Sequence, residues 1–159
     1  LLHIGDFSNL GKHDEVSSFL AWFNKQEYNH KIYCAGNHDI SFQRNIPMKK
    51  KFLQFYSDIH YLEDSSITVE GLKIYGSPWS PEFGSYWVFN LPRGSRYLKE
   101  RWDKIPADTD ILMTHTAPYG ILDPNYEYQS VGCELLRDRI VDIKPKLSVY
   151  GHLHSGRGV

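Results

Sequence analysis

Short apolar runs alternate along the chain with segments of helical periodicity. The runs LLHI, KIYCA, DILMT and LSVY have the length and composition of buried strands. Between the first two runs, apolar side chains recur at the spacing of one helical face, at Val16, Phe19, Leu20 and Phe23. An alternation of strand and helix patterns is typical of an α/β fold.

The middle of the chain predicts a more varied set of elements. We expect a short helix around Phe52 to Tyr56, then strands in IHYL, SITVE and LKIYG, with Gly71 at a turn. An aromatic loop, SPWSPEFGSYWVFNLPRG, precedes a helix near Ser95 to Lys104, and another helix is expected from about Cys133 to Ile143. With 159 residues, of which 41% are hydrophobic, residues 1–159 are expected to form a single domain.

The predicted strands end in polar side chains that can bind metal or move a proton. In open α/β sheets, the crevice beyond the carboxyl ends of the strands is where sites form. If the four strands are neighbours, their endings meet in one pocket. The side chains concerned are Asp6, Asn37, His38, Asp39, His115, His152 and His154.

Each ending also has a plain structural interpretation. The pair Gly5 and Asp6 is common in turns, GNHD can be a capped loop, and a single His115 can be a hydrogen-bonded core histidine. Their joint occurrence, each at a strand end, favours a shared site. Imidazole, carboxylate and amide ligands without thiolate suit catalytic ions rather than a closed structural zinc. Two such ions about 3.5 to 4 Å apart would activate water and stabilise a phosphate ester in hydrolysis.

Charge and cysteine content narrow the class of protein. The formal net charge of −1 gives no basic field, so no nucleic acid partner is expected, and the run Lys49 to Lys51 is interpreted as a solvated helix face. Cys34 and Cys133 lie far apart and form no disulfide framework, which favours a reducing compartment and a cytoplasmic location. We find no apolar run long enough for a bilayer and no signal peptide, so no membrane association is expected.

The motifs GDFS, GNHD, LMTH and GHLH resemble, in this order, those of the calcineurin-like metallophosphoesterase superfamily. The longer stretches GSPWSPEFG, FNLPRG, DILMTHTAPYG and VGCELL resemble its MPPED-like (UPF0046) branch. The resemblance covers nearly the whole chain. It implies a mixed two-sheet β-sandwich flanked by helices, with four layers in the order αββα.

The resemblance also implies a ligand set. Asp6 would bridge two divalent metal ions (Mn, Fe, Zn or Ni), Asn37, His115 and His152 would complete the ligands of one ion, and His154 would bind the other. The superfamily's first motif, Asp-x-His, is absent because only five residues precede Asp6. We therefore expect one well-formed metal site in this chain. A start at Leu1 rather than Met leads us to expect a partial domain, shortened at both ends.

His38 and Asp39 are the catalytic residues that the resemblance implies. His38 would act near the substrate phosphate as a general acid or transition-state stabiliser, with Asp39 orienting its ring. A free imidazole beside an ion-bound phosphate can donate a proton to a leaving alkoxide. The alternative for His38 is a hydrogen bond that fixes its loop.

Side chains of the aromatic loop are candidates for substrate binding. Trp79 and Trp87 could stack on a nucleobase, and Arg93 could pair with a phosphate. Core packing is the alternative for most of these aromatic residues. We expect at least one of the two tryptophans to line the substrate pocket.

Together these features predict a metal-dependent phosphoric ester hydrolase. The expected substrates are phosphodiesters, such as cyclic nucleotides or related small diesters, attacked by a metal-bound hydroxide. Two alternatives remain open: a non-catalytic nucleotide- or phosphoprotein-binding module that retains one metal, and a phosphomonoesterase or nuclease of the same superfamily. The sequence leaves the oligomeric state open.

Overall fold

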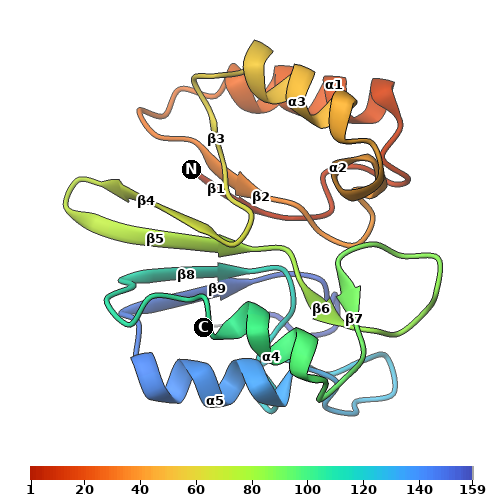
Figure 1. Cartoon of the computed structure of the whole chain (residues 1–159), viewed down its shortest axis with the longest axis vertical. Helices are drawn as coiled ribbons and strands as arrows, with labels where there is room; N and C mark the ends of the chain where they lie inside the picture. The colour runs from red at the N-terminus through yellow and green to blue at the C-terminus, as the bar shows by residue number, and fades with distance from the viewer. Residues whose placement is uncertain (159) are drawn as a thin grey trace.

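The computed structural model describes residues 1–158, which form two β-sheets packed face to face with helices on both outer sides (Figure 1). The first sheet is parallel, in the order β1-β2-β3, with strands at Leu2–Ile4, Ile32–Cys34 and His60–Tyr61. It lies beside three helices: α1 (His13–Asn24), α2 (Ile40–Arg44) and α3 (Ile46–Phe55).

The second sheet is mixed, in the order β4-β5-β8-β9. Its strands are Ser65–Val69, Leu72–Ser77, Ile111–Thr114 and Leu147–Tyr150, and only the β4–β5 pair is antiparallel. Two helices, α4 (Arg96–Trp102) and α5 (Glu134–Ile143), lie on its outer side (Figure 1). A short parallel pair, β6 (Ser80–Pro81) and β7 (Asn90–Leu91), closes the aromatic loop.

Alternation along the strands divides the core into layers. In β5, Ile74 belongs to the apolar cluster between the two sheets, whereas the next residue, Tyr75, belongs to the cluster under the helices. In β8, Met113 and Leu112 divide in the same way. Successive side chains of a strand point to opposite faces, so a sheet with two apolar faces must be covered on both sides. The prediction of an α/β fold is therefore confirmed.

Helix α1 confirms the helical face predicted from sequence. Val16, Leu20 and Phe23 are fully buried against the first sheet. Helices α4 and α5 bury Trp102 and Leu136 against the second sheet in the same manner. Burying side chains of this size contributes roughly 1.5–3 kcal/mol each, which is ample to order short helices that would be marginal alone.

Capping residues set several helix boundaries. Helix α3 starts six residues earlier than the predicted Phe52, because the Asn45 side chain accepts a hydrogen bond from the Met48 amide and Pro47 suits the first turn. Ser95 caps α4 in the same way, through the Leu98 amide. Among residues 1–158, no helix is both long and apolar enough to cross a membrane.

Candidate metal centre

The polar strand endings predicted from sequence meet at one edge of the molecule. Asp6 follows β1, Asn37 follows β2, His115 follows β8 and His152 follows β9. Because β1 pairs in parallel with β2, and β8 with β9, each pair of strands ends on the same side. The two sheets bring these ends together: a carboxylate oxygen of Asp6 lies 3.3 Å from Nε2 of His115.

Four side chains form the core of the site. Ligand atoms of Asp6, His115 and His152 all lie within 4.8 Å of one another. The Asn37 side chain adds a fourth, since its Oδ1 lies 2.9 Å from Nε2 of His115. Asn37 and His115 are buried, so the protein holds both in fixed positions. The structure thus brings together the four residues that the resemblance assigns to one metal.

The hydrogen bonds of His115 define its tautomer. Nδ1 lies 3.0 Å from the backbone oxygen of Ile4, which can only accept, so Nδ1 carries the proton and donates it. In the neutral ring, the Nε2 lone pair then faces oxygens of Asp6 and Asn37. Three electron-rich atoms placed in this way repel one another unless a cation or a proton lies among them. A backbone carbonyl that orients a histidine is a common support for a metal ligand, so the donor set fits a divalent cation.

The charge states of these groups agree with metal ligation. Burial alone would raise the pKa of Asp6, but the hydrogen bond and charge of His115 outweigh it and lower the pKa to about 2. Burial lowers the pKa of His152 to about 3, with a further contribution from His115. Asp6 is therefore an anion and His152 a neutral imidazole at physiological pH, which are the ligand forms that metals require.

Two glycines allow the strand ends to approach this closely. Gly5 has a φ of +82°, and Asp6 follows it with a φ of +55°. At Gly36, a Cβ atom would lie only 2.7 Å from the Asp6 amide nitrogen and would also overlap the side chains of Asp6 and His115. The glycines of GDFS and GNHD thus make room for the ligands themselves.

Asp39 has a different role from the one expected. Within residues 1–158, its fully buried carboxylate forms no hydrogen bond with the His38 ring. It accepts hydrogen bonds from the amides of Asp6 (2.9 Å), Ser8 (2.9 Å) and Gly36 (2.8 Å) and from the Ser8 hydroxyl (2.7 Å). The expectation that Asp39 orients His38 is wrong, because its oxygens are used by the loops after β1 and β2. Burial raises the pKa of Asp39 to about 7, although the bonds from Ser8 and Gly36 oppose this shift.

The His38 ring is held by other partners. Its Nδ1 lies 2.8 Å from the Asn9 backbone oxygen, and its ring centre lies 4.2 Å from that of Trp87. Because a carbonyl can only accept, Nδ1 carries a proton, and Nε2 is left to bind or protonate a ligand. The His38 backbone amide also donates to a carboxylate oxygen of Asp6 at 2.9 Å.

The ligand cluster opens into a pocket of about 210 Å³. Asp6, Asn37, His38 and His152 line it, and so does the exposed His154, although His154 does not join the cluster of ligand atoms. A second hollow of about 400 Å³ adjoins it, because both are lined by Phe83, Asn125, His152 and Leu153. The two hollows form one groove across the site.

The substrate-binding predictions meet different outcomes in the structure. Trp79 lies outside the groove: its indole is 6% exposed, donates to Asp64 at 3.0 Å and stacks under the Arg101 guanidinium at 4.1 Å. Its prediction as a substrate residue is wrong, because these contacts bury it in the core. Trp87 packs against the His38 ring, with 4.2 Å between ring centres, but it is not among the side chains that line the two hollows.

Arg93 lines the second hollow, but its guanidinium already has partners there. It forms a salt bridge with Glu134 at 2.7 Å and donates to the Gly132 and Val131 carbonyl oxygens. Sequence reasoning missed Asn125 and Tyr126, which line the first pocket from the loop after β8. The sequence of this loop carries no periodicity or motif. The aromatic side chain of Tyr126 is the one feature that could have indicated a binding role.

Comparisons with known proteins agree with this geometry. The sequence model described as calcineurin-like phosphoesterase matches residues 1–156. The chain is 42% identical to metallophosphoesterase domain-containing protein 1 of Homo sapiens, over all of this chain and 55% of that protein. It is 36% identical to UPF0046 protein T07D4.2 of Caenorhabditis elegans, over 99% of this chain and 46% of that protein. The chain thus spans about half the length of these relatives.

A solved structure is similar in fold. The crystal structure of TT1561 of Thermus thermophilus superimposes with a TM-score of 0.59 and 15% identity, covering 86% of this chain and 61% of that chain. At this identity, the likeness concerns the arrangement of strands and helices.

Proposed function

Because the chain belongs to the calcineurin-like phosphoesterase family, we propose that it is a metal-dependent hydrolase of small phosphodiesters, with cyclic nucleotides among the candidate substrates. The observation that carries this proposal is the position of His115, whose Nε2 lies 2.9 Å from Oδ1 of Asn37 and 3.3 Å from a carboxylate oxygen of Asp6, two side chains that line a pocket. A divalent cation held there supplies Lewis acidity to the phosphate and lowers the pKa of a water nucleophile.

The chain's own residues have distinct roles in this proposal. Asp6 supplies the negative charge of the site. Asn37 supplies a neutral oxygen, which would leave a bound cation with net positive charge to attract an anionic phosphate. His115 and His152 supply neutral nitrogens. We propose one well-formed ion site, formed by these four residues; His154, exposed in the same pocket, is a candidate ligand of a second ion.

His38 is the proposed proton donor. Its Nδ1 is engaged by the Asn9 carbonyl, so Nε2 is the atom available to protonate a leaving oxygen. Trp87 packs against the ring at 4.2 Å and limits its rotation, which keeps the donor in place. Positioning a donor in this way lowers the entropic cost of reaching the transition state.

The shape and charge of the groove support a small substrate. The pocket beside the ligands is about 210 Å³, and the adjoining hollow, lined by Phe83, is about 400 Å³, enough together for a nucleotide. A net charge of −1 argues against a nuclease, because nucleic-acid binders carry clustered Lys and Arg along the contact face.

A chromogenic assay tests the proposal. With Mn²⁺, we expect hydrolysis of bis(p-nitrophenyl) phosphate that a chelator abolishes, and no activity in an Asp6→Asn, His152→Ala double variant. The matched control is Asp58→Asn with His30→Ala, which removes an exposed carboxylate and an exposed imidazole elsewhere. Full activity in the site variant would overturn the assignment.

Parallel substrates separate the alternatives. Faster turnover of aryl monoesters or of DNA would assign the chain to a phosphatase or nuclease, respectively. Binding of Mn²⁺ and of a nucleotide without turnover of any ester would identify a non-catalytic binding module.

A further inference from the structure

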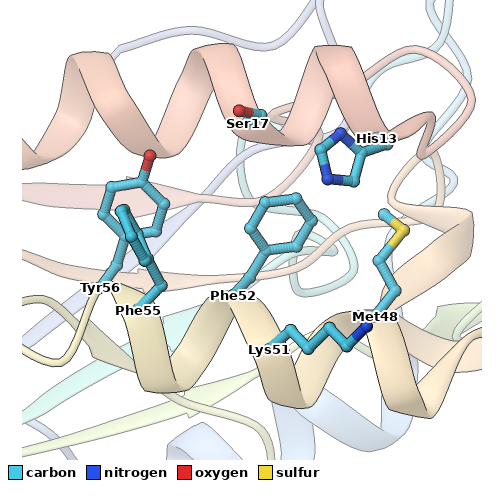
Figure 2. A pocket seen from close by; sticks show the side chains of 7 residues that line it. All are labelled: His13, Ser17, Met48, Lys51, Phe52, Phe55 and Tyr56. Atoms are coloured by element: carbon cyan, nitrogen blue, oxygen red, sulfur yellow. The ribbon is translucent and has the colours of Figure 1, made fainter.

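A second cavity lies between helices α1 and α3, away from the strand ends. Its volume is about 390 Å³, within the range of small-molecule sites. Figure 2 shows side chains of α1 and α3 pointing toward each other across it. None of its lining residues lines the groove at the metal centre. These residues are His13, Ser17, Met48, Lys51, Phe52, Phe55 and Tyr56.

The cavity has an aromatic floor and rim. Phe52 is 8% exposed, and the His13 ring lies 5.1 Å from it. Phe55 is 80% exposed and meets Tyr56 edge-on, at 4.9 Å between ring centres. A phenylalanine that remains in water at the rim of a cavity gains apolar burial if a planar ligand covers it.

The side chains that line the cavity include a cation but no anion. Its lining includes the cationic Lys51 and the titratable His13 but no carboxylate. The sequence predicts that Lys49 to Lys51 form a solvated helix face, but Lys49 is mostly buried and pairs with Glu63 at 2.9 Å. Within residues 1–158, the salt bridges do not include Lys51. An anionic group on a ligand would therefore complement this cation.

We propose that the cavity between α1 and α3 binds a small aromatic carboxylate. The ring lies against Phe52 and Phe55, and the carboxylate lies at the end formed by His13 and Lys51, which Figure 2 shows on the same side of Phe52. This site is separate from the metal centre and requires no metal.

The test is a titration of the ¹⁵N-labelled chain with 2-naphthoate, followed by NMR, beside 2-naphthylmethanol as a neutral probe of the same ring. We expect a Kd on the order of 0.1 mM for 2-naphthoate, with amide shifts in α1 and α3, and at least about tenfold weaker binding of the alcohol. Lys51→Gln should weaken 2-naphthoate about fivefold. Phe55→Ala, at an exposed position, should weaken both probes.

The matched control is Lys50→Gln, which removes an exposed charge next in the chain that does not line the cavity. Its affinity for 2-naphthoate should equal that of the unmodified chain. Equal binding of the two probes, equal losses in the Lys50 and Lys51 variants, or shifts confined to the loops of Asp6 and His152 would each overturn the proposal.

Discussion

The carboxylate of Asp39 accepts a hydrogen bond from the backbone amide of Asp6 at 2.9 Å, although 33 residues separate them in the chain. The same carboxylate binds the Ser8 and Gly36 amides, so it joins the loop after β1 to the loop after β2. Asp6 lies in the first of these two loops, directly after Gly5, with a φ of +55°. The orientation of Asp6, a candidate metal ligand, therefore depends on Asp39, a buried residue outside the cluster of ligand atoms.

Asp39→Asn should weaken both folding and metal binding. The NH₂ group of the Asn side chain cannot accept, so at least one of the amides of Asp6, Ser8 and Gly36 loses its partner, at a cost of about 1–3 kcal/mol in the free energy of unfolding. Urea denaturation measures this loss, and calorimetric titration with Mn²⁺ measures the affinity.

The control for Asp39→Asn is the same substitution at the exposed Asp58, which should change neither quantity. Destabilisation of the Asp39 variant with unchanged Mn²⁺ affinity would mean that the loop junction does not position Asp6.

Gly36→Ala should abolish metal binding even though no ligand is removed. A methyl group there would meet the amide nitrogen of Asp6 at 2.7 Å and the ring of His115. Neither can move freely, because the Asp6 amide donates to the Asp39 carboxylate and the His115 ring donates to the Ile4 carbonyl oxygen. The strand ends must separate, and the ligand atoms separate with them. Gly84→Ala is the control, since its nearest neighbour is a Trp87 ring carbon at 3.4 Å, an ordinary contact.

Mn²⁺ affinity is measured by titration for the Gly36→Ala and Gly84→Ala variants, and a thermal unfolding curve for each shows whether it is folded. Wild-type affinity in Gly36→Ala would show that the strand ends can tolerate a wider spacing than the structure indicates.

The convergence of the candidate ligands could be predicted from sequence because it follows from strand direction and from the packing of the two sheets. Parallel neighbours end on the same side, so residues directly after Ile4, Cys34, Thr114 and Tyr150 must approach one another once the sheets pack. That reasoning needs no side-chain geometry, and the structure agrees with it at Asp6, Asn37, His115 and His152.

The environment of the two tryptophans in the aromatic loop could not be predicted in this way. Trp79 and Trp87 belong to the same unpatterned segment, yet Asp64 and Arg101, from distant parts of the chain, bind Trp79 and bury it. Trp87 instead meets His38. Likewise, the hydrogen-bond donors to Asp39 depend on how the loops after β1 and β2 lie against each other. Such contacts are set by tertiary packing, which leaves no periodic trace in the sequence.

His38→Ala should reduce hydrolysis in a way that depends on the leaving group. A diester with an alkyl leaving group needs a proton from Nε2, so kcat should fall about 10²- to 10³-fold, while p-nitrophenolate leaves without protonation and its ester should lose less. Mn²⁺ affinity should stay nearly unchanged, because the ring lies outside the cluster of ligand atoms. The comparison requires kcat for both esters in both proteins.

A variant at His30, which pairs with Glu70 on the surface, serves as the control for His38. Equal losses on the two esters would show that His38 binds the phosphate or holds its loop rather than donating a proton.

Mn²⁺ affinity should rise with pH because His115 must lose a proton to bind. Burial lowers the pKa of His115, but the hydrogen bond and charge of Asp6 outweigh it and raise the pKa above 6.5. Asp6, with a pKa of about 2, stays ionised and His152, with a pKa of about 3, stays neutral above pH ~5, so neither competes with the ion there. In titrations from pH ~6 to pH ~8, the apparent affinity should increase as the pH rises toward and through the raised pKa of His115, with release of a proton when the ion binds below that pKa. Calorimetric titrations in buffers of different ionisation enthalpy count that proton, and His30→Ala should reproduce the unmodified result. An affinity that stays constant across this range would mean that the proton on Nε2 of His115 does not compete with the ion.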